Sequence, residues 1–107
     1  MIGQYDLVVT KLAWQDVLDI GDYISYTLEQ PDIAGSFVHA LREQIATLKS
    51  LPFRYGVSRD PVLAAQSIRC MPYKNYYVFY EIDEEENRVW ILRIGYNRRN
   101  WKEILLK

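Results

Sequence analysis

The sequence of 107 residues predicts one α+β domain, spanning residues 1–107, in which an antiparallel helix hairpin packs on a small, mostly antiparallel sheet. Two patterns predict this fold class. Apolar residues recur at helical spacing between about residues 11 and 51, and they alternate at strand spacing between about residues 66 and 96. Half of the residues are hydrophobic, which is typical of a chain that buries a core of its own.

An N-terminal strand is predicted over 5–10, because this segment is apolar and β-branched. Thr10 is placed to cap a helix that begins directly after it. The apolar stripe of that helix comprises Trp14, Val17, Leu18, Ile24 and Leu28. Pro31 ends the first helix and suits the first turn of a second one, so it predicts a hinge between two antiparallel helices.

The second predicted helix runs to about Leu51, where Pro52 stops it. Its apolar face comprises Ala34, Phe37, Val38, Leu41, Ile45 and Leu48. Residues 53–64 contain glycine and proline, and we expect a loop with little regular structure there. Three strands follow at about 66–71, 75–83 and 88–96, and a short helix or tail runs from Asn100 to Lys107.

Alternation along these strands predicts which side chains share a face of the sheet. The helix-facing set comprises Ile68, Cys70, Tyr76, Val78, Tyr80, Ile82, Trp90, Leu92, Ile94 and Tyr96. The opposite set mixes cations with apolar side chains, as an exposed binding face does. It comprises Arg69, Met71, Tyr77, Phe79, Ile91 and Arg93.

The net charge is −1 and the pI is about 5.8, which argues against a protein that holds nucleic acid by bulk electrostatics. The charge is unevenly distributed, however. Residues 1–64 carry five basic and eight acidic side chains, whereas 65–107 carry eight basic and six acidic ones. We therefore expect an anionic partner to meet the second part of the chain.

Cys70 is the only cysteine and His39 the only histidine, so we expect no disulfide, no metal site and no cofactor. Apolar runs fall short of the roughly 20 residues of a membrane span. A strand-like segment rather than a signal peptide follows Met1. We expect a cytoplasmic protein that does not bind membranes.

Several segments follow one another in a specific order. They are Asp22-Tyr-Ile-Ser-Tyr26, Pro31-Asp-Ile-Ala-Gly-Ser-Phe37, Leu48-Lys-Ser-Leu-Pro52, Arg69, Tyr76-Tyr-Val-Phe-Tyr80, Trp90-Ile-Leu-Arg-Ile94 and Asn97-Arg-Arg-Asn-Trp101. In this order they resemble the RelE/ParE superfamily of toxins from bacterial type II toxin-antitoxin systems, over nearly the whole chain. The long helix hairpin and the paired arginines are more similar to the ParE and plasmid-stabilisation branch than to the ribosome-dependent nucleases.

The resemblance implies a growth-inhibiting toxin that a cognate antitoxin neutralises. A ParE-like toxin would poison DNA gyrase without being an enzyme, whereas a RelE-like toxin would be a metal-independent endoribonuclease that cuts mRNA on the ribosome. Tyr96 stands where many relatives have histidine, Asn100 where they have an acidic residue, and Tyr77 where the nuclease pattern has arginine. These departures favour the gyrase target. A third reading is a toxin fold without activity that serves as a binding module.

For an RNA-cleaving toxin, the candidate catalytic residues are Arg69, Tyr96, Arg98 and Arg99. The candidate target-binding residues are Arg69, Tyr77, Phe79, Arg93, Arg98, Arg99 and Trp101. The alternative is that these arginines pair with carboxylates of the chain or of an acidic antitoxin segment, and that the aromatic rings pack. His39 lies roughly opposite the apolar face of its helix and is expected at the surface.

Overall fold

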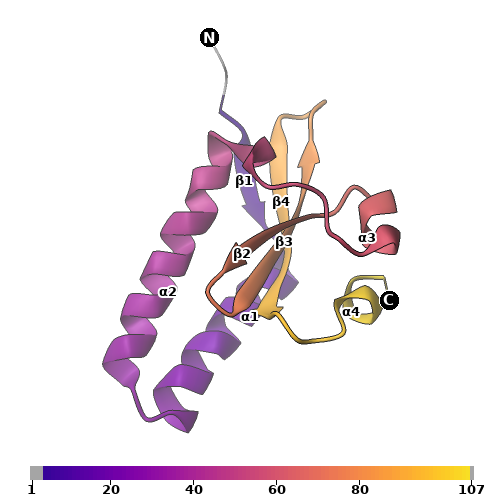
Figure 1. Ribbon diagram of the computed structural model, residues 1–107. Helices are drawn as coiled ribbons and strands as arrows, with labels where there is room; N and C mark the ends of the chain where they lie inside the picture. Colours follow the sequence, from indigo (N-terminus) through magenta and orange to yellow (C-terminus); the bar gives the residue numbers. More distant parts are fainter. Residues whose placement is uncertain (1–3, 107) are drawn as a thin grey trace.

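The computed structural model describes residues 4–106 and consists of a four-stranded sheet with helices on both faces (Figure 1). The strand order is β1-β4-β3-β2. The short strand β1 (Asp6–Val9) runs parallel to β4 (Arg88–Tyr96). The two remaining strands, β3 (Tyr76–Asp83) and β2 (Arg69–Tyr73), continue the sheet in antiparallel fashion. The predicted fold class is confirmed.

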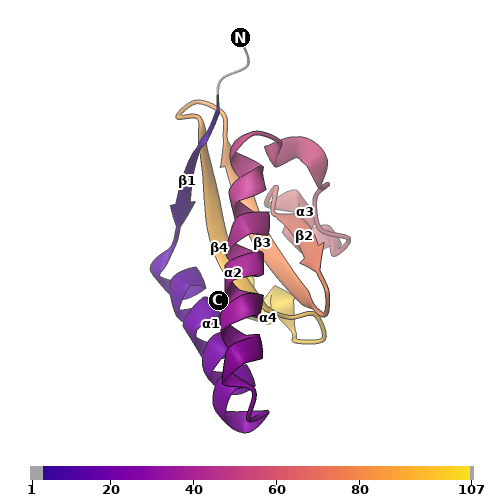
Figure 2. The same cartoon turned by 90° about the vertical axis from the view of Figure 1, so that its left-hand side faces the viewer.

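The helix hairpin covers one face of the sheet, which we call the first face (Figure 2). It consists of α1 (Lys11–Asp22), a π-helical turn (Tyr23–Thr27) and α2 (Pro31–Ala46), which a 3-10 turn (Thr47–Lys49) extends. Thr10 caps α1 as predicted, because its hydroxyl oxygen accepts the N–H of Ala13 at 3.2 Å. Pro31 opens α2, which confirms the predicted hinge.

The face that α1 buries differs from the predicted stripe. Ala13, Val17, Ile20 and Ile24 are buried. In contrast, Trp14, Leu18 and Leu28 are 42%, 47% and 48% exposed. Ala13 is fully buried, and a side chain as small as alanine contributes little to a hydrophobic pattern, so the pattern favoured the larger neighbouring residues. The predicted face of α2 is correct, with Phe37 and Val38 partly buried at its border.

Two short helices cover the opposite face of the sheet, which we call the second face (Figure 1). The segment expected to be irregular contains a 3-10 turn (Pro52–Arg54) and α3 (Pro61–Ala65), which the side chain of Asp60 caps. The C-terminal helix is α4 (Trp101–Leu105), and Lys107 lies outside the described residues. Leu63, Ile68, Phe79 and Trp101 form a buried group here, the second-face cluster.

Strand pairing changes several of the predicted faces. Cys70 pairs with Phe79 and Met71 with Val78, so Cys70 lies on the second face and Met71 is buried on the first. The sequence prediction had these two reversed, because alternation within a strand leaves open which of its two sets faces the helices.

A β-bulge in β4 accounts for the misplaced side chains of that strand. Phe79 pairs with Arg93 but Tyr80 pairs with Ile91, so Leu92 is an extra residue. Ile91 therefore joins the first-face core together with Ile94, while Leu92 packs against the second-face cluster. A strict period of two cannot hold across such a bulge.

Candidate functional site

Arg69 does not share a surface with Arg93, although alternation placed the two together. Arg69 is on β2, opposite Tyr80 of β3, and its Nη1 donates to the carbonyl oxygen of Tyr55 at 2.7 Å. Its guanidinium also lies 4.9 Å from the ring centroid of Phe53. Arg69 thus holds the segment that follows α2 against the sheet.

Tyr80 fixes the same segment from within the core. Its hydroxyl donates to the carbonyl oxygen of Pro52 at 2.6 Å, and the side chain is fully buried. Burial raises the pKa of Tyr80 to about 12. The two side chains therefore act together on residues 52–55, away from the arginine pair at the end of β4.

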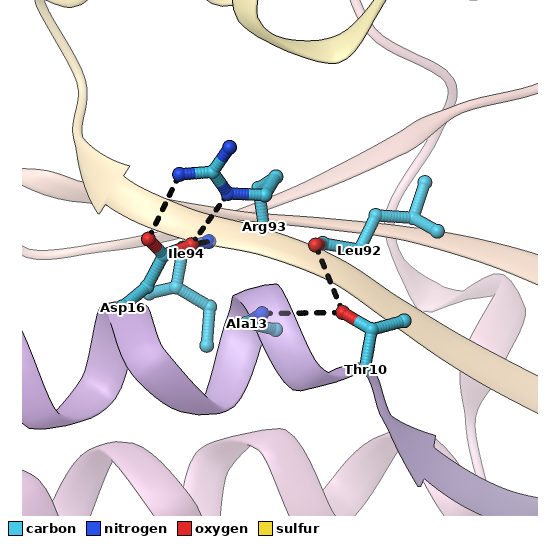
Figure 3. Close-up of polar contacts among 6 residues, drawn as sticks. All are labelled: Thr10, Ala13, Asp16, Leu92, Arg93 and Ile94. Atoms are coloured by element: carbon cyan, nitrogen blue, oxygen red, sulfur yellow. Dashed lines mark hydrogen bonds and ion pairs between the residues drawn. The ribbon is translucent and has the colours of Figure 1, made fainter.

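Arg93 is held by a carboxylate that sequence reasoning missed (Figure 3). Asp16 of α1 is 7% exposed and accepts from Arg93 Nε at 2.8 Å, from Arg93 Nη2 at 3.0 Å and from the backbone N–H of Ile94 at 2.9 Å. The hydrogen bond to Asp16 raises the pKa of Arg93. The signal in the sequence was an aspartate three residues after Ala13 and four before Ile20, within the stripe that α1 buries.

The same helix closes the edge of β4 beyond the point where β1 ends. The Thr10 hydroxyl donates to the carbonyl oxygen of Leu92 at 3.1 Å, and Asp16 accepts the N–H of Ile94 on the same edge (Figure 3). The side chains of Asp16 and of the capping residue Thr10 thus replace a neighbouring strand over this part of β4. Arg93 is drawn into this arrangement and directed toward α1.

Phe79 and Trp101, two predicted target-binding residues, are 2% and 6% exposed. Their ring centroids lie 4.9 Å apart, and Trp101 Nε1 donates to the carbonyl oxygen of Tyr96 at 3.0 Å. Gly95 makes room for this indole, since a Cβ there would lie 2.8 Å from it. The exposed face that alternation predicted is therefore covered, because α3 and α4 pack on it.

Other candidate residues remain accessible at the end of β4. Arg98 and Arg99 are exposed, Tyr96 is 45% exposed and Tyr77 is half-buried. Arg99 borders both of the larger hollows at this end of the sheet. Of the predicted site residues, these four offer groups to a partner without a change in the fold.

The first hollow, which we call the cationic groove, has a volume of about 770 Å³ and lies between α3 and α4. Arg59, Arg99 and Lys102 contribute positive charge to its walls, and Tyr77 and Cys70 lie among its apolar lining. Burial raises the pKa of the Cys70 thiol to about 12, so the sulfur stays protonated and behaves as a small apolar group.

The second hollow, which we call the tyrosine cleft, has a volume of about 540 Å³. It lies between the C-terminal end of α1 and the ends of β3 and β4, and Tyr23, Tyr76 and Tyr96 line it. The rings of Tyr76 and Tyr96 are 6.4 Å apart at an angle of 80°. Burial, followed by the nearby phenols of Tyr23 and Tyr96, raises the pKa of Tyr76.

His39 lies on α2 with its side chain 76% exposed, 3.2 Å from Glu43. Its predicted surface position is confirmed, and it belongs to neither hollow. Among residues 4–106, no three His, Cys, Asp or Glu side chains are grouped closely enough to hold a metal ion. Within the same part of the chain, every helix is too short or too polar to cross a bilayer.

Comparison with known families agrees with this architecture. A family model described as the ParE toxin of the type II toxin-antitoxin system parDE matches residues 7–101. Through this match the chain belongs to the broader class of RelE/ParE superfamily toxins, and its strand, helix hairpin, antiparallel sheet and C-terminal helix agree with that class. Within that class the chain belongs to the ParE toxin family, as the matched residues show.

Solved structures share the fold at low sequence identity. The chromosomal ParDE toxin-antitoxin system from P. aeruginosa has a TM-score of 0.71 and 21% identity, over 87% of this chain and 96% of that one. The toxin-antitoxin complex RelBE2 from Mycobacterium tuberculosis has a TM-score of 0.62 and 19% identity, over 92% and 98% of the two chains. A mutant of the E. coli toxin RelE in the free state has a TM-score of 0.63 and 11% identity, over 95% and 93%. A comparison with curated proteins finds no match.

Proposed function

We propose that this chain is a cytoplasmic, growth-inhibiting toxin that poisons DNA gyrase by binding it, and that a cognate antitoxin neutralises it. The observation that supports this proposal is that two of the four candidate arginines are already bound to groups within the protein. Arg93 is paired with Asp16, and Arg69 with the carbonyl of Tyr55. Only Arg98 and Arg99 remain as exposed arginines among the candidate site residues.

RNA cleavage requires a base for the attacking hydroxyl, cations for the phosphorane charge and an acid for the leaving oxygen, all converging on one phosphate. The engaged arginines do not converge in this way. Exposed cations beside a groove that is partly apolar suit the binding of another protein instead, because such charges steer the encounter of two proteins and fix their relative orientation. This reasoning favours the gyrase target over mRNA.

The antitoxin is proposed to place an acidic, apolar segment in the cationic groove. Arg59, Arg99 and Lys102 would pair with its carboxylates, while the exposed Val57 and the half-buried Tyr77 would receive its apolar side chains. A segment that enters an existing groove with complementary charge is a common mode of peptide recognition.

The gyrase target is tested with toxin made by cell-free synthesis, mixed with purified gyrase, ATP and supercoiled plasmid. The toxin should trap gyrase covalently attached to cleaved DNA. Detergent then denatures the gyrase and protease digests it, so the trapped complexes are counted as linear plasmid. Arg99→Ala should yield less linear DNA, because it removes an exposed charge from the binding surface. His39→Gln, on the exposed side of α2 and outside both hollows, should yield the wild-type amount.

Other outcomes would favour the alternatives. If translating ribosomes acquire mRNA cuts in the presence of the toxin, and Arg98→Ala abolishes them, the protein is an endoribonuclease of the RelE kind. If expression without an antitoxin leaves bacterial growth unchanged, the chain is a binding module that keeps the toxin fold without its activity.

A further inference from the structure

Three tyrosines line the tyrosine cleft, and aromatic rings attract cations to their faces. Tyr76 and Tyr96 present rings at 80° to each other, with centroids 6.4 Å apart, and so form two walls of a corner. Tyr23 supplies a third aromatic side chain and is 52% exposed. It lies on the π-helical turn, and such irregular turns recur at functional sites.

The charge on the helix side of the cleft is negative. Asp19 lines the cleft, and its carboxylate accepts a hydrogen bond from the amide of Gln15. Among residues 4–106 no cation lies within ion-pair distance of it, so its negative charge is available to a ligand. The last turn of α1 carries no basic residue. Leu28, where the helical segment ends, also lines the cleft, so the negative end of the helix dipole lies nearby.

Among the described residues, Arg99 is the one positive side chain in the lining of the cleft, and it stands at its border. Its guanidinium lies 5.4 Å from the ring centroid of Trp101. It also lies above Gly95, where a Cβ would be 3.5 Å from Nη1. Because Trp101 packs on the second face, these two contacts place the guanidinium at the border of the cleft that lies toward that face.

We propose that the tyrosine cleft binds the positively charged group of an Arg or Lys side chain that a partner protein presents. Tyr76, Tyr96 and Tyr23 would offer their ring faces to this cation, and the carboxylate of Asp19 would offset its charge. The cleft is distinct from the cationic groove, so the protein would recognise both signs of charge at neighbouring places. The inference holds whether or not gyrase is the target.

The test titrates ¹⁵N-labelled protein, made by cell-free synthesis, with the capped peptides Gly-Arg-Gly, Gly-Leu-Gly and Gly-Glu-Gly. The arginine peptide should cause saturable amide shifts at residues 19–28, at 75–76 and at 94–96, whereas the other two peptides should not. Asp19→Asn and Tyr23→Leu should each weaken the binding about threefold, by loss of a charge and of an aromatic face respectively.

Matched controls lie on the same elements but outside the cleft lining. Asp22→Asn removes another charge from α1, and Tyr26→Leu removes another exposed tyrosine from the π-helical turn. Both should bind the arginine peptide as the wild type does. The proposal is overturned if the glutamate peptide shifts these amides instead, if none of the peptides does, or if Asp19→Asn and Tyr23→Leu bind like their controls. The amide spectrum of each variant reports whether it is folded.

Discussion

The two faces of the sheet are covered in unequal ways. Helices of 12 and 16 residues cover the first face, and fourteen of the described residues are buried there. Helices of five residues each cover the second face, and its cluster contains four buried residues. Because such short helices are unstable on their own, the second cover depends on a few large side chains. The cationic groove, where we propose that the antitoxin binds, borders this smaller cover.

The largest effects should come from removing one leucine from each face. Leu41→Ala on the first face should lower the free energy of unfolding by about 3–5 kcal/mol, because long helices cannot settle into the cavity. Leu63→Ala on the second face should lower it by about 2 kcal/mol, because α3 is short and can move inward. Urea denaturation measures both. Equal losses would contradict the proposed inequality of the two faces.

Asp16→Ala tests how α1 is joined to β4. It should lower the free energy of unfolding by about 3 kcal/mol, since it leaves Arg93 without its carboxylate and the Ile94 N–H without an acceptor. Asp22→Ala on the exposed side of α1 is the control and should change stability by less than about 0.5 kcal/mol. A loss for Asp16→Ala no larger than the control would show that this contact does not stabilise the fold.

Gly95→Ala acts on the second cover alone. The added methyl would lie 2.8 Å from Trp101, so the indole must shift and the protein should lose about 1–3 kcal/mol. Hydrogen exchange should accelerate in α4 more than in α2. Gly35→Ala is the matched control, because nothing lies within 4 Å of its Cβ and alanine favours a helix. Unchanged exchange in α4 would mean that Trp101 does not hold this helix.

The smallest effect concerns Cys70 and pH. Its pKa is raised from 9.0 to about 12 in the folded protein, so the unfolded chain loses the proton first as pH rises. The stability associated with the thiol is fully present below pH 9 and declines above it. Wild type should therefore lose more stability between pH 8 and pH 10 than Cys70→Ala does, as thermal unfolding at both pH values would measure. Equal losses of stability in the two proteins would show that the thiol is in contact with water and that its pKa is not raised.

Much of the first face could be predicted from the sequence. The cap at Thr10, the hinge at Pro31 and the buried face of α2 depend on neighbouring residues and on helical spacing. The candidate site was harder to predict. Arg98 and Arg99 are exposed as expected, whereas Arg93 found a partner 77 positions away in Asp16. No local pattern encodes a pair so distant in sequence, and for the same reason the covering of Phe79 and Trp101 escaped prediction.

By itself the sequence determined the fold class, the helix hairpin and the alternation of the middle strand, because these follow from periodicity and from the backbone preferences of proline and threonine. The tertiary structure decided which set of β2 faces the helices, where the bulge interrupts β4, and which arginines remain free. These features depend on pairing between segments that are far apart in the chain. A shift of one residue in such pairing exchanges buried and exposed side chains at no cost to the local pattern.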